Sequence, residues 1–162
     1  MIYFDNAATT KPHKDVLDSF NKVNETVYFN PNSPHKWGLQ AEKVLLQAKE
    51  RISSMLSIGQ NTDVIFTSGA TESNNIALKG NAYRKKQFAN EIITSVLEHP
   101  SVLEVMRYLE EDGFVLKYVD VNADGRVDIE HLASLMNDKV GLVSCMYVNN
   151  IMGQIQPIAQ IV

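Results

Sequence analysis

Hydrophobic positions along the chain follow two spacings. Apolar residues that recur every three or four positions predict amphipathic helices over about 15–27 and 38–56. Short apolar runs that are typical of buried strands follow, at 64–66, 92–96, 115–119 and 140–148. Helical patterns lie between and after these runs, at about 71–88, 101–111 and 129–136, and Pro157 begins another. Alternating strands and helices predict an α/β fold with a mostly parallel sheet flanked by helices.

Composition and charge narrow the class of protein. Hydrophobic residues make up 44% of the chain and charged residues 21%, which argues against disorder. A net charge of -4 gives no reason to expect direct nucleic-acid binding or an anionic membrane. No apolar run approaches the roughly 20 residues that cross a bilayer, and the start lacks the features of a signal peptide. Together with a single cysteine, Cys145, these features favour a cytoplasmic protein.

A turn of small residues follows the predicted strand at 64–66 and opens the next helix. The start of a helix has unpaired N–H groups and the positive end of the helix dipole. Gly69 and Ala70 would let an anion approach the backbone, and Thr71 adds a hydroxyl. These residues therefore predict a phosphate site. They equally fit a plain helix start in which Thr71 is the capping residue.

Two polar segments follow the ends of predicted strands, where ligands bind in open α/β sheets. His99 could stack on an aromatic ligand or move protons, or it could cap the helix that Pro100 begins. Asn149 and Asn150 could donate amide hydrogens to a ligand, or they could form a turn. Cys145 lies within an apolar run, and we expect its thiol to be unreactive.

We expect no metal site in the sequence. The histidines and the cysteine do not have the spacing of zinc ligands. Five positions match a calcium-binding loop: Asp120, Asn122, Asp124, Gly125 and Asp128. However, His131 stands where such a loop needs a glutamate, and a strand pattern precedes the segment. The segment is therefore predicted to be a polar turn around Asp124 and Gly125.

Five segments, taken in order, resemble motifs of cysteine desulfurases. The family's motifs are matched in this order: YLDNAATT by residues 3–10, NPSSxHxxG by 30–38, FTSGATESNN by 66–75, IITSxxEH by 93–99 and MxxNNEIG by 146–153. The resemblance is to the nitrogen-fixation and iron–sulfur-cluster type, within the class-V aminotransferases. It implies part of the large domain of a fold type I transferase that depends on pyridoxal 5'-phosphate (PLP). Residues 15–162 would be an incomplete PLP-binding large domain, and residues 1–14 an N-terminal arm at the small domain and the active-site rim.

The resemblance also implies a role for individual residues. Ala70 and Thr71 would contact the PLP phosphate, and His99 would stack on the ring and act as a catalytic residue. Asn150 would bind the ring oxygen of PLP or the carboxylate of the substrate. Three residues would line the substrate end of the pocket: Asn6, Ala7 and Ala8.

The implied reaction converts L-cysteine to L-alanine and an enzyme persulfide. The sulfur would go to iron–sulfur clusters or tRNA thiolation through an acceptor protein, either a scaffold or a tRNA-thiolating enzyme, and the enzyme would be a homodimer. The family's Schiff-base lysine, pyridine-binding aspartate and loop cysteine have no counterpart here, and Ile151 replaces a family glutamate. We therefore expect this chain alone to be catalytically incomplete. The alternatives are another class-V PLP enzyme, such as an aminotransferase or selenocysteine lyase, or a truncated interaction protein without catalysis.

Overall fold

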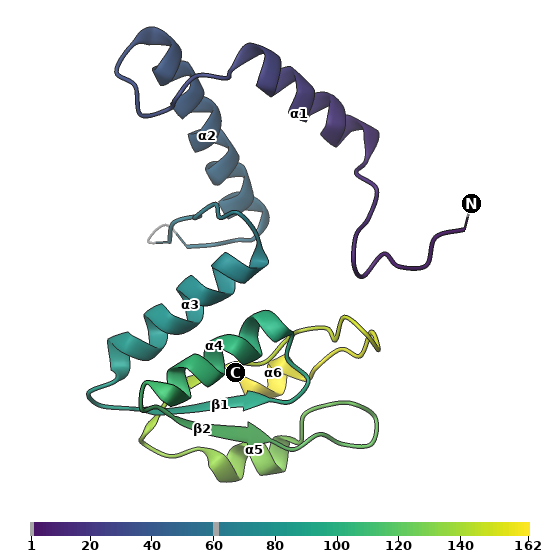
Figure 1. Cartoon of the computed structure of the whole chain (residues 1–162), viewed down its shortest axis with the longest axis vertical. Coiled ribbons are helices and arrows are strands. Elements are labelled where there is room, and N and C mark those ends of the chain that lie inside the picture. Colours follow the sequence, from purple (N-terminus) through teal and green to yellow (C-terminus); the bar gives the residue numbers. More distant parts are fainter. Residues whose placement is uncertain (1, 60–61) are drawn as a thin grey trace. The chain divides into compact units, whose positions relative to one another are not determined.

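The computed structural model describes residues 2–59 and 62–162. It consists of two compact units, Met1–Phe66 and Thr67–Val162 (Figure 1). Met1, where the predicted N-terminal arm starts, lies outside the described residues. Across the described ranges, every helix is too short or too polar to cross a membrane.

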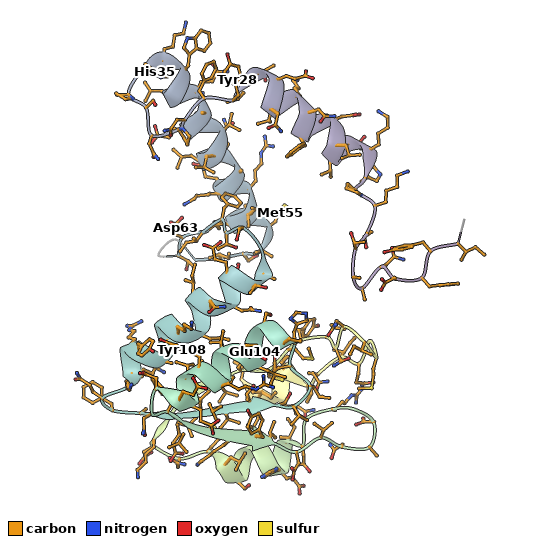
Figure 2. The ribbon with its side chains drawn as sticks, in the orientation of Figure 1. Tyr28, His35, Met55, Asp63, Glu104 and Tyr108 are labelled. Carbon is orange, nitrogen blue, oxygen red and sulfur yellow. The ribbon has the colours of Figure 1, made fainter. Side chains whose placement is uncertain are left out.

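The first unit contains two helices, α1 (Lys14–Thr26) and α2 (Lys36–Met55), which confirm the two predicted amphipathic helices. An imidazole caps each one, and His35 Nδ1 accepts from the Gly38 N–H of α2 at 3.1 Å (Figure 2). The apolar faces of α1 and α2 line a groove of about 640 Å³. Its lining is almost entirely apolar: Phe20, Val23, Val27, Phe29, Pro31, Ala41, Val44, Leu45, Ala48 and Phe66.

Gly38 allows the turn at 30–38, which resembles a family motif, to pack closely against the start of α2. A Cβ atom at this position would lie 2.1 Å from the backbone oxygen of Ser33 and 2.9 Å from that of Asn30. The turn that precedes α2 therefore packs directly against the helix backbone, and only glycine leaves room for it. This close contact sets the direction in which the chain enters α2.

The second unit is built on a three-stranded parallel sheet. The strands lie in the order β2 (Val115–Val119), β1 (Glu91–Ser95) and β3 (Val140–Val143). The helices are α3 (Ala70–Lys85), α4 (Pro100–Glu111), α5 (Ile129–Leu135) and α6 (Ile158–Ile161). Figure 1 shows α4 and α5 on opposite faces of β1 and β2. This unit confirms the predicted α/β fold.

Successive residues of β1 point to opposite faces of the sheet and pack into two different hydrophobic cores. Ile92, 1% exposed, packs with side chains of α3 and α4, whereas Ile93, 0% exposed, packs with side chains of α5. The first core consists of Leu78, Ala82, Ile92, Val102, Val105, Met106, Leu109 and Phe114. The second consists of Ile93, Val119, Val127 and Leu132. The central strand is therefore fixed on both faces, which sets the position of its carboxyl end.

Two of the predicted strands differ from the structure. Residues 64–66 form no strand, because they have no ladder partner among the described residues, and Ile65 and Phe66 are exposed. The run at 140–148 is a strand only as far as Val143. Beyond it, the Met146 N–H donates to the Glu98 side chain instead of to a neighbouring strand, so the chain leaves the sheet. The prediction of one strand over 140–148 was therefore wrong at its carboxyl end.

Candidate functional site

The start of α3 is open to an anion. Its capping residue is Gly69, without a side-chain cap, and the first bond of the helix runs from the Ser73 N–H to the Gly69 oxygen at 3.2 Å. The N–H groups of residues 70–72 precede that bond. A Cβ atom at Gly69 would meet nothing within 4 Å. Thr71 is the second helical residue, so the alternative in which Thr71 caps the helix is wrong.

One carboxylate shares this helix start. Glu72 Oε2 accepts from the hydroxyl and from the backbone N–H of Ser68, both at 2.7 Å. These two hydrogen bonds lower the pKa of the Glu72 carboxyl. The negative charge is therefore held against Ser68, before the helix begins. The helix dipole, the amides of Ala70 and Thr71 and the exposed Thr71 hydroxyl form a donor set that fits a phosphate group.

His99 lies between β1 and α4 and caps α4. Its Nδ1 accepts from the Ser101 N–H at 3.1 Å, and Pro100 occupies the first turn of the helix. The capping role that the sequence allowed is therefore present. The His99 side chain is nevertheless exposed, and its ring lines a pocket that follows the carboxyl end of β1. Capping by Nδ1 leaves Nε2 available for other contacts, so a second role for the ring stays a prediction.

A chain of hydrogen bonds joins His99 to α3. Asn74 Nδ2 donates to Ser101 Oγ at 2.8 Å, and Ser101 Oγ lies 2.9 Å from His99 Nδ1. Asn74 is three residues beyond Thr71 on α3, which places the two on the same side of the helix. The helix that begins at the predicted phosphate site is thus linked to the imidazole by hydrogen bonds. Sequence reasoning missed both Asn74 and Ser101.

The two asparagines after β3 have different roles. Asn149 is 5% exposed, and its Oδ1 accepts from the N–H groups of Ile151 and Met152, both at 2.9 Å. Its Nδ2 donates to the Leu97 oxygen at 3.3 Å, which ties this turn to the loop after β1. Asn150 is exposed at the next position. Asn149 therefore builds the turn, and Asn150 is the residue free to meet a ligand.

His99 and Asn150 line the same pocket, of about 260 Å³. Residues 96–100 and 149–152 form its wall. The sheet topology explains this meeting, because β1 and β3 are parallel neighbours and the segments that follow them lie at the same edge. The structure thus brings two of the predicted cofactor-binding residues together. Ala70 and Thr71 are joined to them through α3 and Asn74.

Glu98 is a buried carboxyl in this wall that the sequence interpretation did not single out. It is 7% exposed and accepts a hydrogen bond from the Met146 N–H. Burial raises the pKa of the Glu98 carboxyl, and the Met146 hydrogen bond opposes this effect. Burial, together with the charge of Glu98, raises the pKa of the Cys145 thiol to about 11. Cys145 thus stays protonated near neutral pH, which agrees with the predicted unreactive thiol.

The predicted substrate-binding residues, Asn6, Ala7 and Ala8, lie in the first unit. They form a turn in which the Ala8 N–H donates to the Asp5 oxygen at 3.2 Å. All three are exposed. Their contribution to a substrate pocket stays a prediction.

The segment that matches a calcium loop contains the predicted polar turn. Gly125 has φ +81°, the left-handed conformation that favours glycine, and its N–H donates to the Asn122 oxygen at 2.9 Å. Asp128 caps α5 by accepting from the His131 N–H at 3.0 Å. The acidic residues of this segment thus stabilise the connection between β2 and α5.

Comparisons with known proteins support the predicted family and fold class. The sequence model of the family "Aminotransferase class-V" matches residues 2–162. The NifS/IcsS protein homolog of Lactobacillus delbrueckii subsp. bulgaricus is 44% identical over 162 residues, which are 99% of this chain and 42% of that protein. The cysteine desulfurase IscS of Ehrlichia chaffeensis is 44% identical over 161 residues, 99% of this chain and 39% of that protein.

Solved structures show the same similarity. A NifS-like protein superposes with a TM-score of 0.92 at 40% identity, over 97% of this chain and 43% of that one. The structure called SspA in complex with cysteine has a TM-score of 0.90 at 34% identity, over 98% of this chain and 46% of that one. The chain spans less than half the length of each of these relatives. Since the family model matches all but the first residue, the chain belongs to the class-V aminotransferase family.

Proposed function

We propose that this chain is the N-terminal portion of a PLP-dependent cysteine desulfurase. The observation that carries the proposal is the hydrogen-bonded assembly of unit Thr67–Val162, in which an open helix start and an exposed imidazole are joined through Asn74 and Ser101. Relatives named cysteine desulfurase support it, and so does the relative whose structure contains cysteine. The reaction would convert L-cysteine to L-alanine and leave the sulfur as an enzyme persulfide.

The class-V family is PLP-dependent, and the donor set of unit Thr67–Val162 suits this cofactor. When bound, PLP supplies an electron-withdrawing ring that stabilises negative charge on the substrate. The N–H groups of Ala70 and Thr71, with the Thr71 hydroxyl, would bind its phosphate at the start of α3. His99 would lie against the ring, and Asn150 would bind the ring oxygen or the substrate carboxylate.

His99 would also hold and move a proton at Nε2. This nitrogen is the available one, because Nδ1 accepts from the Ser101 N–H. A positioned imidazole is the commonest general acid–base group near neutral pH. Asn6, Ala7 and Ala8 would contribute the substrate end of the pocket.

The proposal includes partners and a location. The complete protein would act as a cytoplasmic homodimer and pass sulfur to an acceptor protein, either an iron–sulfur scaffold or a tRNA-thiolating enzyme. The residues of this chain supply the phosphate and imidazole parts of the site, and catalysis would need further parts of the complete protein.

The test uses the complete protein. Purified protein is loaded with PLP, the bound cofactor is measured by absorbance, and L-cysteine is added with a thiol reductant. We expect one PLP per chain and equal amounts of alanine and sulfide. PLP binding with amino-group transfer to a keto acid, but no sulfide, would indicate an aminotransferase instead. Protein that binds no PLP would contradict the proposal and indicate a role without catalysis.

A further inference from the structure

The contacts around His99 determine which of its nitrogens carries the proton. A backbone N–H can only donate, so the Ser101 N–H, 3.1 Å from Nδ1, requires Nδ1 to accept. In a neutral imidazole whose Nδ1 accepts, the proton is on Nε2. The capping contact thus already favours one tautomer.

The Ser101 hydroxyl reinforces this preference because Asn74 orients it. Asn74 Nδ2 donates to Ser101 Oγ at 2.8 Å, and an amide NH₂ group cannot accept. With that contact on its oxygen, Ser101 has its own hydrogen free to donate to His99 Nδ1, 2.9 Å away. Asn74 and Ser101 are both half-buried, so water competes less for these contacts than on an open surface.

We propose that Asn74 and Ser101 are positioning residues that hold His99 in its Nε2–H tautomer, with Nδ1 turned to α4 and the other edge of the ring at the pocket. This inference rests on the proposed function, in which Nε2 is the atom that holds and moves a proton. In this proposal, Asn74 acts through Ser101, and Ser101 acts through His99. Their effect is to remove ring orientations that present Nδ1 instead of Nε2.

The test is ¹⁵N NMR of labelled histidine side chains in the complete protein without PLP, which distinguishes the two tautomers directly. We expect Ser101→Ala and Asn74→Ala each to reduce the ratio of Nε2–H to Nδ1–H tautomer at His99 by about two- to tenfold, the value of one net hydrogen bond. Ser101→Thr keeps the hydroxyl and should keep the ratio. Asn74→Ala should add little to Ser101→Ala, because the two act in series.

Two controls belong to the same spectra. Ser134→Ala removes a hydroxyl that bonds the His131 oxygen at 2.7 Å, and it should leave the His99 signals unchanged. His131, whose Nδ1 accepts from the Asp120 N–H at 3.0 Å, is an internal reference that Ser101→Ala should not move. An unchanged tautomer ratio in Ser101→Ala would overturn the inference.

Turnover gives a second, separate readout. In protein loaded with PLP, Ser101→Ala should lower kcat for L-cysteine by about two- to tenfold, while bound PLP stays at the wild-type level. A shifted tautomer with unchanged kcat would show that the orientation does not serve the reaction, and would also overturn the inference. Wild-type protein without PLP binding or desulfurase activity would refute the proposed function alone, since the tautomer measurement does not need the cofactor.

Discussion

Asn149→Ala and Asn150→Ala should affect different properties of the protein, although the two residues are neighbours. Asn149 is buried and holds the turn at 149–153, whereas Asn150 is exposed at the pocket. Removing the first side chain should loosen the turn. Removing the second should leave the turn intact and weaken only the binding of PLP or of the substrate.

The magnitude follows from the bonds of Asn149. Its side chain accepts from two N–H groups at 2.9 Å and donates to the Leu97 oxygen at 3.3 Å. Each net hydrogen bond contributes about 0.5–1.5 kcal/mol. Ile151 and Met152 are 87% and 59% exposed, so their freed N–H groups can bond to water, which reduces the loss. We therefore expect about 1.5–3 kcal/mol of local stability to disappear in Asn149→Ala.

Hydrogen exchange of the complete protein, measured on a peptide that contains residues 151 and 152, reports this local stability. Loss of about 1.5–3 kcal/mol should speed exchange there by roughly ten- to a hundredfold. Asn150→Ala should leave exchange at wild-type rates and lower the affinity for PLP or for L-cysteine by about two- to tenfold. Equal exchange rates in the two variants, or wild-type exchange in Asn149→Ala, would refute the division of roles between these residues.

Substitutions at four further residues test other contacts. Thr71→Ala should lower PLP affinity about tenfold, the value of a bond to a charged group, in a PLP titration; because Gly69 is the cap, the melting temperature without PLP should not change. His99→Phe should bind PLP better than His99→Ala. Both variants should nevertheless turn over L-cysteine about a hundredfold or more slower than wild type. A wild-type kcat in His99→Phe would exclude proton transfer by His99. Burial raises the pKa of Glu98, so the contribution of this residue to the stability of the folded protein falls as pH rises from the ordinary glutamate value of 4.5 through the raised one. Glu98→Gln should flatten that decline in denaturant titrations across pH, and an unchanged pH dependence would contradict the burial of a charge. Gly38→Ala places a Cβ atom 2.1 Å from a backbone oxygen. It should therefore destabilise the complete protein by roughly 1–3 kcal/mol, measured by urea unfolding. Wild-type stability of this variant would show that the turn can move away.

Periodicity in the sequence predicted most of the elements, because burial on one face of a helix or strand leaves a direct record in residue order. It failed where another part of the chain decides the outcome. The run at 64–66 is apolar, but a strand also needs a neighbour. The run at 140–148 continues past Val143, yet the Glu98 side chain takes the Met146 N–H and ends the strand.

The site was predictable to a similar extent. Residues at strand ends and helix starts stand out locally, which is why Ala70, Thr71, His99 and the pair of asparagines could be named as candidates, whereas the choice of Asn150 within the pair came from the family resemblance. The hydrogen bond between Asn74 and Ser101 joins residues 27 positions apart, and no local pattern signals it. Capping propensity did not locate the start of α3, because threonine and glycine are about equally good capping residues, and the cap is Gly69, two residues before Thr71.

Because the side chains of β1 alternate between two cores, the number of residues in this strand sets the position of the loop that carries His99. Ile92 and Ile93 point into different cores, so inserting or deleting one residue would exchange their faces and move the following loop by about 3.3 Å. Many apolar side chains could replace either isoleucine, but the count of residues from the cores to His99 cannot change without taking the imidazole out of its pocket. We therefore expect natural variants of this protein to differ in the composition of the 91–99 segment and to keep its length.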